Sequence, residues 1–137
     1  MARIDYLNPE TSTQRVNDIV EKNRNFNIFQ MLGHSESHLV NYCRLGAAIR
    51  HKGELDAGLR ELAITRTGIL CGSEYEVIAH KRIGADVGLS DEKIDALHQG
   101  ADAAVYTPIE QAVLRFTDEV VSRSRPSDET FDALRDL

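Results

Sequence analysis

Apolar side chains recur along most of the chain at intervals of three and four residues, which is the spacing of helices with one buried face. Hydroxyl and carboxylate residues, glycines and prolines separate these segments, as at helix caps and turns. No segment alternates strictly between apolar and polar residues, as a half-buried strand would. The pattern therefore predicts a single all-α domain over residues 1–137.

The cap signals place the expected helices. We expect helices to begin near Thr11–Thr13, Ser35, Asp56, Ser73, Ser90, Thr107 and Pro126. The first should end near Asn23, the second at Lys52, the third before Cys71 and the fourth near Val87. Only a short apolar turn is expected over residues 27–32. The amphipathic pattern of the last segment continues to residues 136–137, so we expect either a shortened chain or an end that packs against a neighbouring subunit.

Composition narrows the class of protein. Of 137 residues, 42% are hydrophobic and 28% charged, which is typical of a soluble globular protein. The formal net charge is -6, whereas nucleic acids and anionic membranes attract basic surfaces, so we expect neither as a partner. No secretory signal or membrane-length apolar run is visible. Two cysteines make no disulfide framework, and a reducing, cytoplasmic location is expected.

The stretch CGSEYEVIAH, residues 71–80, concentrates reactive side chains at the start of an expected helix. Ser73 and Glu76 have the S-x-x-E spacing of a capping box, which would explain both residues structurally. Glu76 and His80 lie four residues apart and therefore share a helix face, which suits a site. Both interpretations are open from this stretch alone.

Glu61 lies on the preceding expected helix, in line with Ala57, Thr65 and Gly68. These small residues would let another backbone or a ligand approach closely. A tight turn at Gly72 would fold the two helices back on each other, with Glu61 facing the second. The alternative is that Glu61 only pairs with an arginine at the surface.

The segments LRELAITR, GSEYEVIAH and VGLSDEKIDAL, in this order, resemble the carboxymuconolactone decarboxylase / alkylhydroperoxidase D-like family. The resemblance is detailed from Leu55 to Leu97 and looser from Arg15 to Val121. It implies an all-α, alkylhydroperoxidase D-like helical bundle. It also implies a homo-trimer or homo-hexamer whose active site lies near a subunit interface.

The chain departs from the peroxidases of that family at the redox motif. They carry Cys-x-x-Cys-x-x-x-His, with a glutamate twelve residues before the first cysteine. Here Glu61 and His80 keep their places, but Ser73 and Glu76 stand at the cysteine positions. A dithiol peroxidase needs one thiolate to attack the peroxide and a second thiol to resolve the sulfenic acid, and serine and glutamate do neither. The runner-up hypothesis is a peroxidase that uses Cys71 as a lone thiol, activated by a helix N-terminus and by His80.

The residues that remain suit general acid–base chemistry. The decarboxylase branch of the family works without redox cysteines or a cofactor. The resemblance therefore implies a cofactor-free enzyme on a small acidic or lactone-like metabolite, with His80 as the acid or base and Glu61 as its orienting partner. The candidate catalytic residues are His80, Glu61, Glu76 and Ser73. The candidate substrate-binding residues are Arg66, Tyr75 and Arg82, and the guanidinium groups of the two arginines suit carboxylates.

Two other interpretations fit the residues. Glu61, Glu76 and His80 have donors that suit iron, manganese or zinc, but we expect no metal because the motif occurs once. His34 and His38 are four residues apart but have no evident third ligand. A non-catalytic oligomer is the other alternative, and a Ser73–Glu76 capping box would support it.

Overall fold

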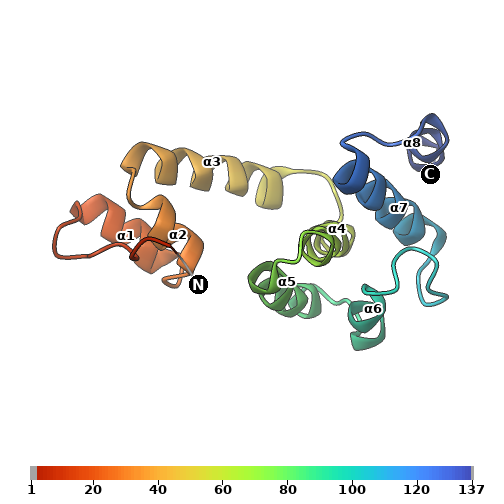
Figure 1. Cartoon of the computed structure of the whole chain (residues 1–137), viewed down its shortest axis with the longest axis horizontal. Helices are drawn as coiled ribbons and strands as arrows, with labels where there is room; N and C mark the ends of the chain where they lie inside the picture. The colour runs from red at the N-terminus through yellow and green to blue at the C-terminus, as the bar shows by residue number, and fades with distance from the viewer. Residues whose placement is uncertain (1–2, 137) are drawn as a thin grey trace. The chain divides into compact units, whose positions relative to one another are not determined.

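The computed structural model describes residues 3–136 and contains helices only over that range (Figure 1). Its contacts divide the chain into two compact units, Met1–Gly53 and Glu54–Leu137. Each unit has its own hydrophobic core. The expectation of one domain over residues 1–137 stays a prediction. No helix in the described range is both long and apolar enough to span a membrane.

The first unit contains α1 (Gln14–Lys22), α2 (Asn27–Leu32) and α3 (Glu36–Lys52). Thr13 caps α1 by accepting a hydrogen bond from the backbone of Val16, as the sequence predicts. The prediction of a turn over residues 27–32 was wrong, because this segment is the helix α2. A helix of six residues is too short to display helical periodicity. The buried side chains of this unit are Val16, Val20, Phe29 and Leu39.

The longest helix of this unit, α3, buries little of its apolar surface. Leu39 is its only buried residue, and Tyr42 packs edge-on against Phe29. Leu45 and Ile49 are 62% and 58% exposed. Ser35 stands at the N-cap as predicted, but its side chain makes no capping bond; its hydroxyl lies 3.4 Å from that of Ser37.

The second unit contains α4 (Ala57–Leu70), α5 (Glu74–Asp86), α6 (Asp91–Ala96), α7 (Pro108–Arg123) and α8 (Asp128–Arg135). Helix α4 packs against both α5 and α7 (Figure 1). The core of the unit contains Leu62, Ala96, Leu97, Ala101, Ala103, Tyr106 and Leu114. The predicted helix starts agree with the structure here, since the side chains of Asp56, Ser90 and Ser127 all accept capping bonds.

Two features fix the position of α5 against α4. Gly72 has a φ of +66°, so the chain reverses between the helices in a left-handed conformation that suits glycine. Gly68 faces α5 so closely that a Cβ there would lie 3.2 Å from the Cβ of Glu76 and 3.2 Å from the side chain of Val77. The expected close approach at small residues of α4 is thus present at Gly68.

On its other side, α4 is held by Arg66. This guanidinium donates to both carboxylate oxygens of Asp118 on α7, at 2.6 and 3.1 Å. It also donates to the backbone carbonyl of Leu97, at 2.7 Å. Planar, two-point pairs of this kind fix orientation as well as distance. Helix α4 is therefore tied to its neighbours on both sides.

Candidate active site

The centre of the site is a hydrogen bond between Glu61 on α4 and His80 on α5. The Nδ1 atom of His80 lies 2.6 Å from Oε2 of Glu61. Glu61 is only 1% exposed, and the side chain of His80 is 13% exposed. The other oxygen of Glu61 accepts a bond from Nε of Arg60, at 3.1 Å. A buried carboxylate is tolerated here because both of its oxygens have cationic or N–H partners.

These partners set the charge of Glu61. Burial alone raises the pKa of a carboxyl group, but the hydrogen bonds and charges of His80 and Arg60 outweigh it, so the pKa of Glu61 lies below its ordinary value. Glu61 is therefore ionised near neutral pH. The sequence also allowed Glu61 to pair with an arginine at the surface. Glu61 does pair with an arginine, Arg60, but it is buried.

An ionised Glu61 decides how His80 is oriented. A carboxylate only accepts hydrogen bonds, so Nδ1 of His80 carries a proton. The second ring nitrogen, Nε2, is then the atom left to exchange a proton with a ligand. It lies 3.4 Å from Oε2 of Glu76, one turn earlier on α5. The imidazole thus has a carboxylate at each end.

The expected capping box at Ser73 and Glu76 is absent. Ser73 does stand at the N-cap of α5, but its side chain makes no capping bond. The carboxylate of Glu76 is directed instead to His80, its neighbour one turn along the helix. Tertiary packing explains this choice, because Gly68 brings α4 against the backbone and Cβ of this first turn. The structural explanation for Glu76 therefore does not hold, and Ser73 is a half-buried residue beside the site.

The three candidate substrate-binding residues lie in different surroundings. Arg66 is committed to Asp118 and to backbone carbonyls, which makes it a structural residue of α4. Tyr75 and Arg82 are exposed on α5. They lie on other faces of the helix than His80, since they are five residues before it and two after it. Their roles in binding stay predictions.

The cysteines are not part of the Glu61–His80 pair. Cys71 is the C-cap of α4 and is exposed, so it precedes α5 and does not extend its active face. Cys43 lies on α3 in the first unit, partly buried, and burial raises the pKa of its thiol despite an opposing effect of Arg50. A raised pKa leaves less of the reactive thiolate.

Metal ligands do not converge in the described residues. No group of three or more histidine, cysteine, aspartate or glutamate side chains in residues 3–136 is arranged to hold a metal ion. Glu61 and Glu76 lie at opposite ends of the His80 ring rather than around one point. In the first unit, Nε2 of His34 is engaged by the backbone carbonyl of Asp5, at 2.9 Å.

Two contacts of the site could not be predicted from the sequence: that of Arg60 with Glu61 and that of Gly68 with Glu76. The sequence allows Glu61 to pair with an arginine but does not single out Arg60, because adjacent residues of a helix point about 100° apart and the pattern gives no sign that they meet. The row of small residues beside Glu61 marks Gly68 as a place where another helix packs, but it does not indicate that the packed residue is Glu76.

Comparison with known proteins agrees with this picture. A crystal structure described as an alkylhydroperoxidase AhpD core, an uncharacterized peroxidase-related protein from Ralstonia eutropha JMP134, superposes with a TM-score of 0.79. It is 23% identical, and the match covers 98% of this chain and 74% of that one, which establishes the shared all-α fold. No protein of curated function matches the chain. Residues 39–119, more than half of the chain, match the carboxymuconolactone decarboxylase family, and the chain belongs to that family.

Proposed function

We propose that this protein is a cofactor-free acid–base enzyme that acts on a small acidic or lactone-like metabolite. The observation that carries the proposal is the 2.6 Å hydrogen bond between His80 and a carboxylate that is 1% exposed. A buried, ionised orienting group behind an imidazole is an arrangement suited to moving a proton. Membership of the carboxymuconolactone decarboxylase family supports a decarboxylation or lactone reaction.

In this proposal, His80 exchanges a proton with the substrate through Nε2. Glu61 holds the ring by Nδ1, and Arg60 holds Glu61. Glu76 lies at the reactive nitrogen, where the first turn of α5 reaches the surface. Ser73 lies three residues before Glu76 and can supply a hydroxyl to a bound ligand.

We further propose that the enzyme works as a homo-trimer or homo-hexamer. Exposed apolar side chains on α3, among them Leu45 and Ile49, support association. Large apolar side chains that are exposed together often mark an interface.

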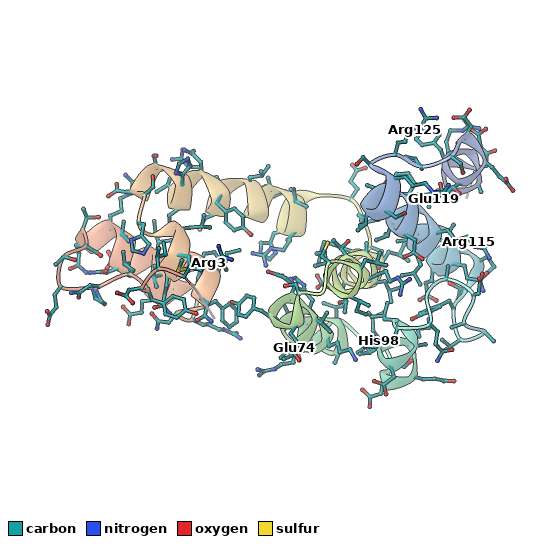
Figure 2. All side chains as sticks on the ribbon, viewed as in Figure 1. Arg3, Glu74, His98, Arg115, Glu119 and Arg125 are labelled. Atoms are coloured by element: carbon teal, nitrogen blue, oxygen red, sulfur yellow. The ribbon has the colours of Figure 1, made fainter. Side chains whose placement is uncertain are left out.

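The test is turnover of γ-carboxymuconolactone and a panel of small lactone acids, followed by release of carbon dioxide and loss of the lactone absorbance. We expect His80→Gln to lower kcat at least a hundredfold, in line with the usual contribution of a general acid or base. Glu74→Gln is the matched control, because Glu74 lies on the same helix and is exposed (Figure 2). Equal turnover by wild-type protein and His80→Gln would refute the proposal.

The lone-thiol peroxidase is the runner-up, and the exposed position of Cys71 is the observation that keeps it open. In a hydroperoxide-consumption assay with an external thiol reductant, the acid–base proposal expects Cys71→Ser to match wild-type protein. A loss of hydroperoxide consumption in Cys71→Ser would favour the runner-up instead.

A further inference from the structure

Glu61 has two partners of different kinds, one at each carboxylate oxygen. Oε2 lies 2.6 Å from Nδ1 of His80, and Oε1 accepts a hydrogen bond from Nε of Arg60 at 3.1 Å. An imidazole changes its charge when it exchanges a proton, whereas a guanidinium group stays protonated in proteins. Glu61 therefore has one partner whose charge varies during proton exchange and one whose charge is constant.

Burial makes this difference between the partners important. The side chains of Arg60 and Glu61 are 14% and 1% exposed, so water does little to solvate the carboxylate. Burial raises the pKa of Glu61, and the hydrogen bonds and charges of His80 and Arg60 lower it by more. Of these two partners, only Arg60 keeps its positive charge when the imidazole is neutral.

A surface pair of the same length shows why burial matters. Arg115 lies 3.1 Å from Asp102, and their side chains are 56% and 90% exposed (Figure 2). Water and salt screen an exposed pair of this kind, so it contributes little. The Arg60–Glu61 pair is shielded from that screening, and its charges act on each other more strongly.

We propose that Arg60 keeps Glu61 ionised in both protonation states of His80 and is thereby a positioning residue of the acid–base site. This inference rests on the proposed function and adds how the ring is held while it reacts. When Nε2 gives a proton to a substrate, the electron pair of the N–H bond stays on the ring. When Nε2 takes a proton, its lone pair forms the new bond. In either direction one proton crosses at Nε2, and Glu61 neither gains nor loses one.

The charge of Glu61 matters because it sets which nitrogen of the neutral ring keeps a proton. An ionised Glu61 only accepts, so the neutral ring keeps its proton on Nδ1 and has a lone pair at Nε2. A protonated Glu61 could donate to Nδ1, and the remaining ring proton would then lie on Nε2. Nε2 would have no lone pair with which to take a proton. Arg60 therefore preserves the form of the ring that reacts at Nε2.

The experiment measures the ionisation of Glu61 directly, without substrate. The whole chain is labelled with ¹³C at the glutamate carboxyl groups, and the signal of Glu61, assigned with Glu61→Gln, is followed by NMR as pH changes. The reference is His80→Gln, because an amide is a neutral N–H donor, as the neutral ring is. We expect Glu61 to stay ionised at neutral pH in His80→Gln, where Arg60 is still present.

Removal of Arg60 in the His80→Gln background takes away the constant charge. In this double variant, we expect Arg60→Gln to lower the ratio of carboxylate to carboxylic acid at Glu61 about tenfold at a given pH. A neighbouring arginine has effects of at least that order on a carboxyl group. Arg60→Gln alone should change the ratio in the same direction, so the result does not depend on the folding of the double variant.

Two further variants test whether charge is the cause. Arg60→Lys keeps the positive charge and should keep most of the carboxylate, whereas Arg115→Gln removes an exposed arginine and should leave the ratio unchanged. The proposal is overturned if Arg60→Gln leaves the ratio unchanged, or if Arg60→Lys lowers it as much as Arg60→Gln does. It is equally overturned if Glu61 is already protonated at neutral pH in His80→Gln.

This readout separates the inference from the proposed function. If Arg60→Gln changes the ratio as expected but His80→Gln retains full turnover, Arg60 does set the charge of Glu61 and the acid–base proposal is wrong. If the ratio does not respond and His80→Gln abolishes turnover, His80 is catalytic but Arg60 does not hold its partner in the ionised form.

Discussion

Two helix starts in this protein share one local motif and have different structures. Ser73-x-x-Glu76 opens α5 and Thr107-x-x-Glu110 opens α7, and both have the spacing of a capping box. At α7 the box forms, and Glu110 accepts bonds from the backbone and hydroxyl of Thr107, at 2.8 and 2.9 Å. At α5 it does not form, and Glu76 is directed to His80.

The difference lies in the neighbours rather than in the motif. Lys93 reaches Glu110 at 2.6 Å and neutralises it where it is, at the start of its own helix. Glu76 has an imidazole one turn along α5 and a closely packed helix beside it. A structural glutamate and a candidate functional glutamate can therefore share one local signature, and only their tertiary partners distinguish them.

The largest expected contrast is in stability. Glu110→Ala removes a helix cap and leaves Lys93 without its partner, so we expect the free energy of unfolding to fall by about 2 kcal/mol. Glu76→Ala removes no cap and should cost less than about 1 kcal/mol. Urea unfolding of both variants measures the difference. Equal losses would mean that the two glutamates play the same structural role.

A glycine exchange tests why Glu76 differs. Gly68→Ala adds a methyl group 3.2 Å from Glu76 and Val77, so we expect a loss on the order of 1 kcal/mol and a displaced Glu76–His80 contact. The matched control is Gly46→Ala in α3, where the nearest atom to the new methyl group is 3.9 Å away. That change should raise stability by about 0.5–1 kcal/mol, because alanine favours helix more than glycine does. Thermal unfolding of both variants measures the sign of each change in stability. A stabilised Gly68→Ala would contradict close packing at this site.

The smallest expected effect concerns pH. Burial raises the pKa of Glu110, but hydrogen bonds from Lys93 and Thr107 outweigh it, so its pKa in the folded protein lies below the ordinary 4.5. Because the folded-state pKa is the lower one, Glu110 stabilises the protein above its unfolded-state pKa. This contribution is lost as pH falls from about 4.5 through the folded-state value.

Glu110→Gln should therefore flatten the dependence of unfolding free energy on pH in the acid range. A series of urea unfolding curves between about pH 3 and pH 6 measures the two slopes. Identical slopes for wild-type protein and Glu110→Gln would show that Lys93 and Thr107 do not hold Glu110 in its charged form.

The sequence predicted most of the fold because its helix signals are local. Asp56, Ser90 and Ser127 cap the helices that they were expected to cap, and Gly72 makes the expected turn. The short helix α2 was missed because it has no capping side chain to mark its start and six residues are too few to display a period. Pairing of Glu61 with His80 could be anticipated, since the spacing and the turn brought the helices together.

The rest of the site depends on contacts between distant residues. Whether Glu76 caps its helix or faces His80 depends on how α4 packs against it, and α4 lies outside the Ser73–Glu76 motif. The engagement of Arg66 with Asp118 joins positions 52 residues apart, and no local pattern announces it. The assignment of Arg66 to substrate therefore rested on charge alone, without knowledge of its partner.

The position of α4 between α5 and α7 has a consequence for how this scaffold could be altered. Several of its residues make contacts that a substitution would break. Glu61 pairs with His80, Arg66 pairs with Asp118 of α7, and Gly68 lets α5 pack closely. Tyr75 and Arg82, on the outward side of α5, are exposed rather than packed in the core. Laboratory evolution toward new substrates should therefore draw its tolerated changes from the exposed face of α5, while α4 serves as the constant part of the scaffold.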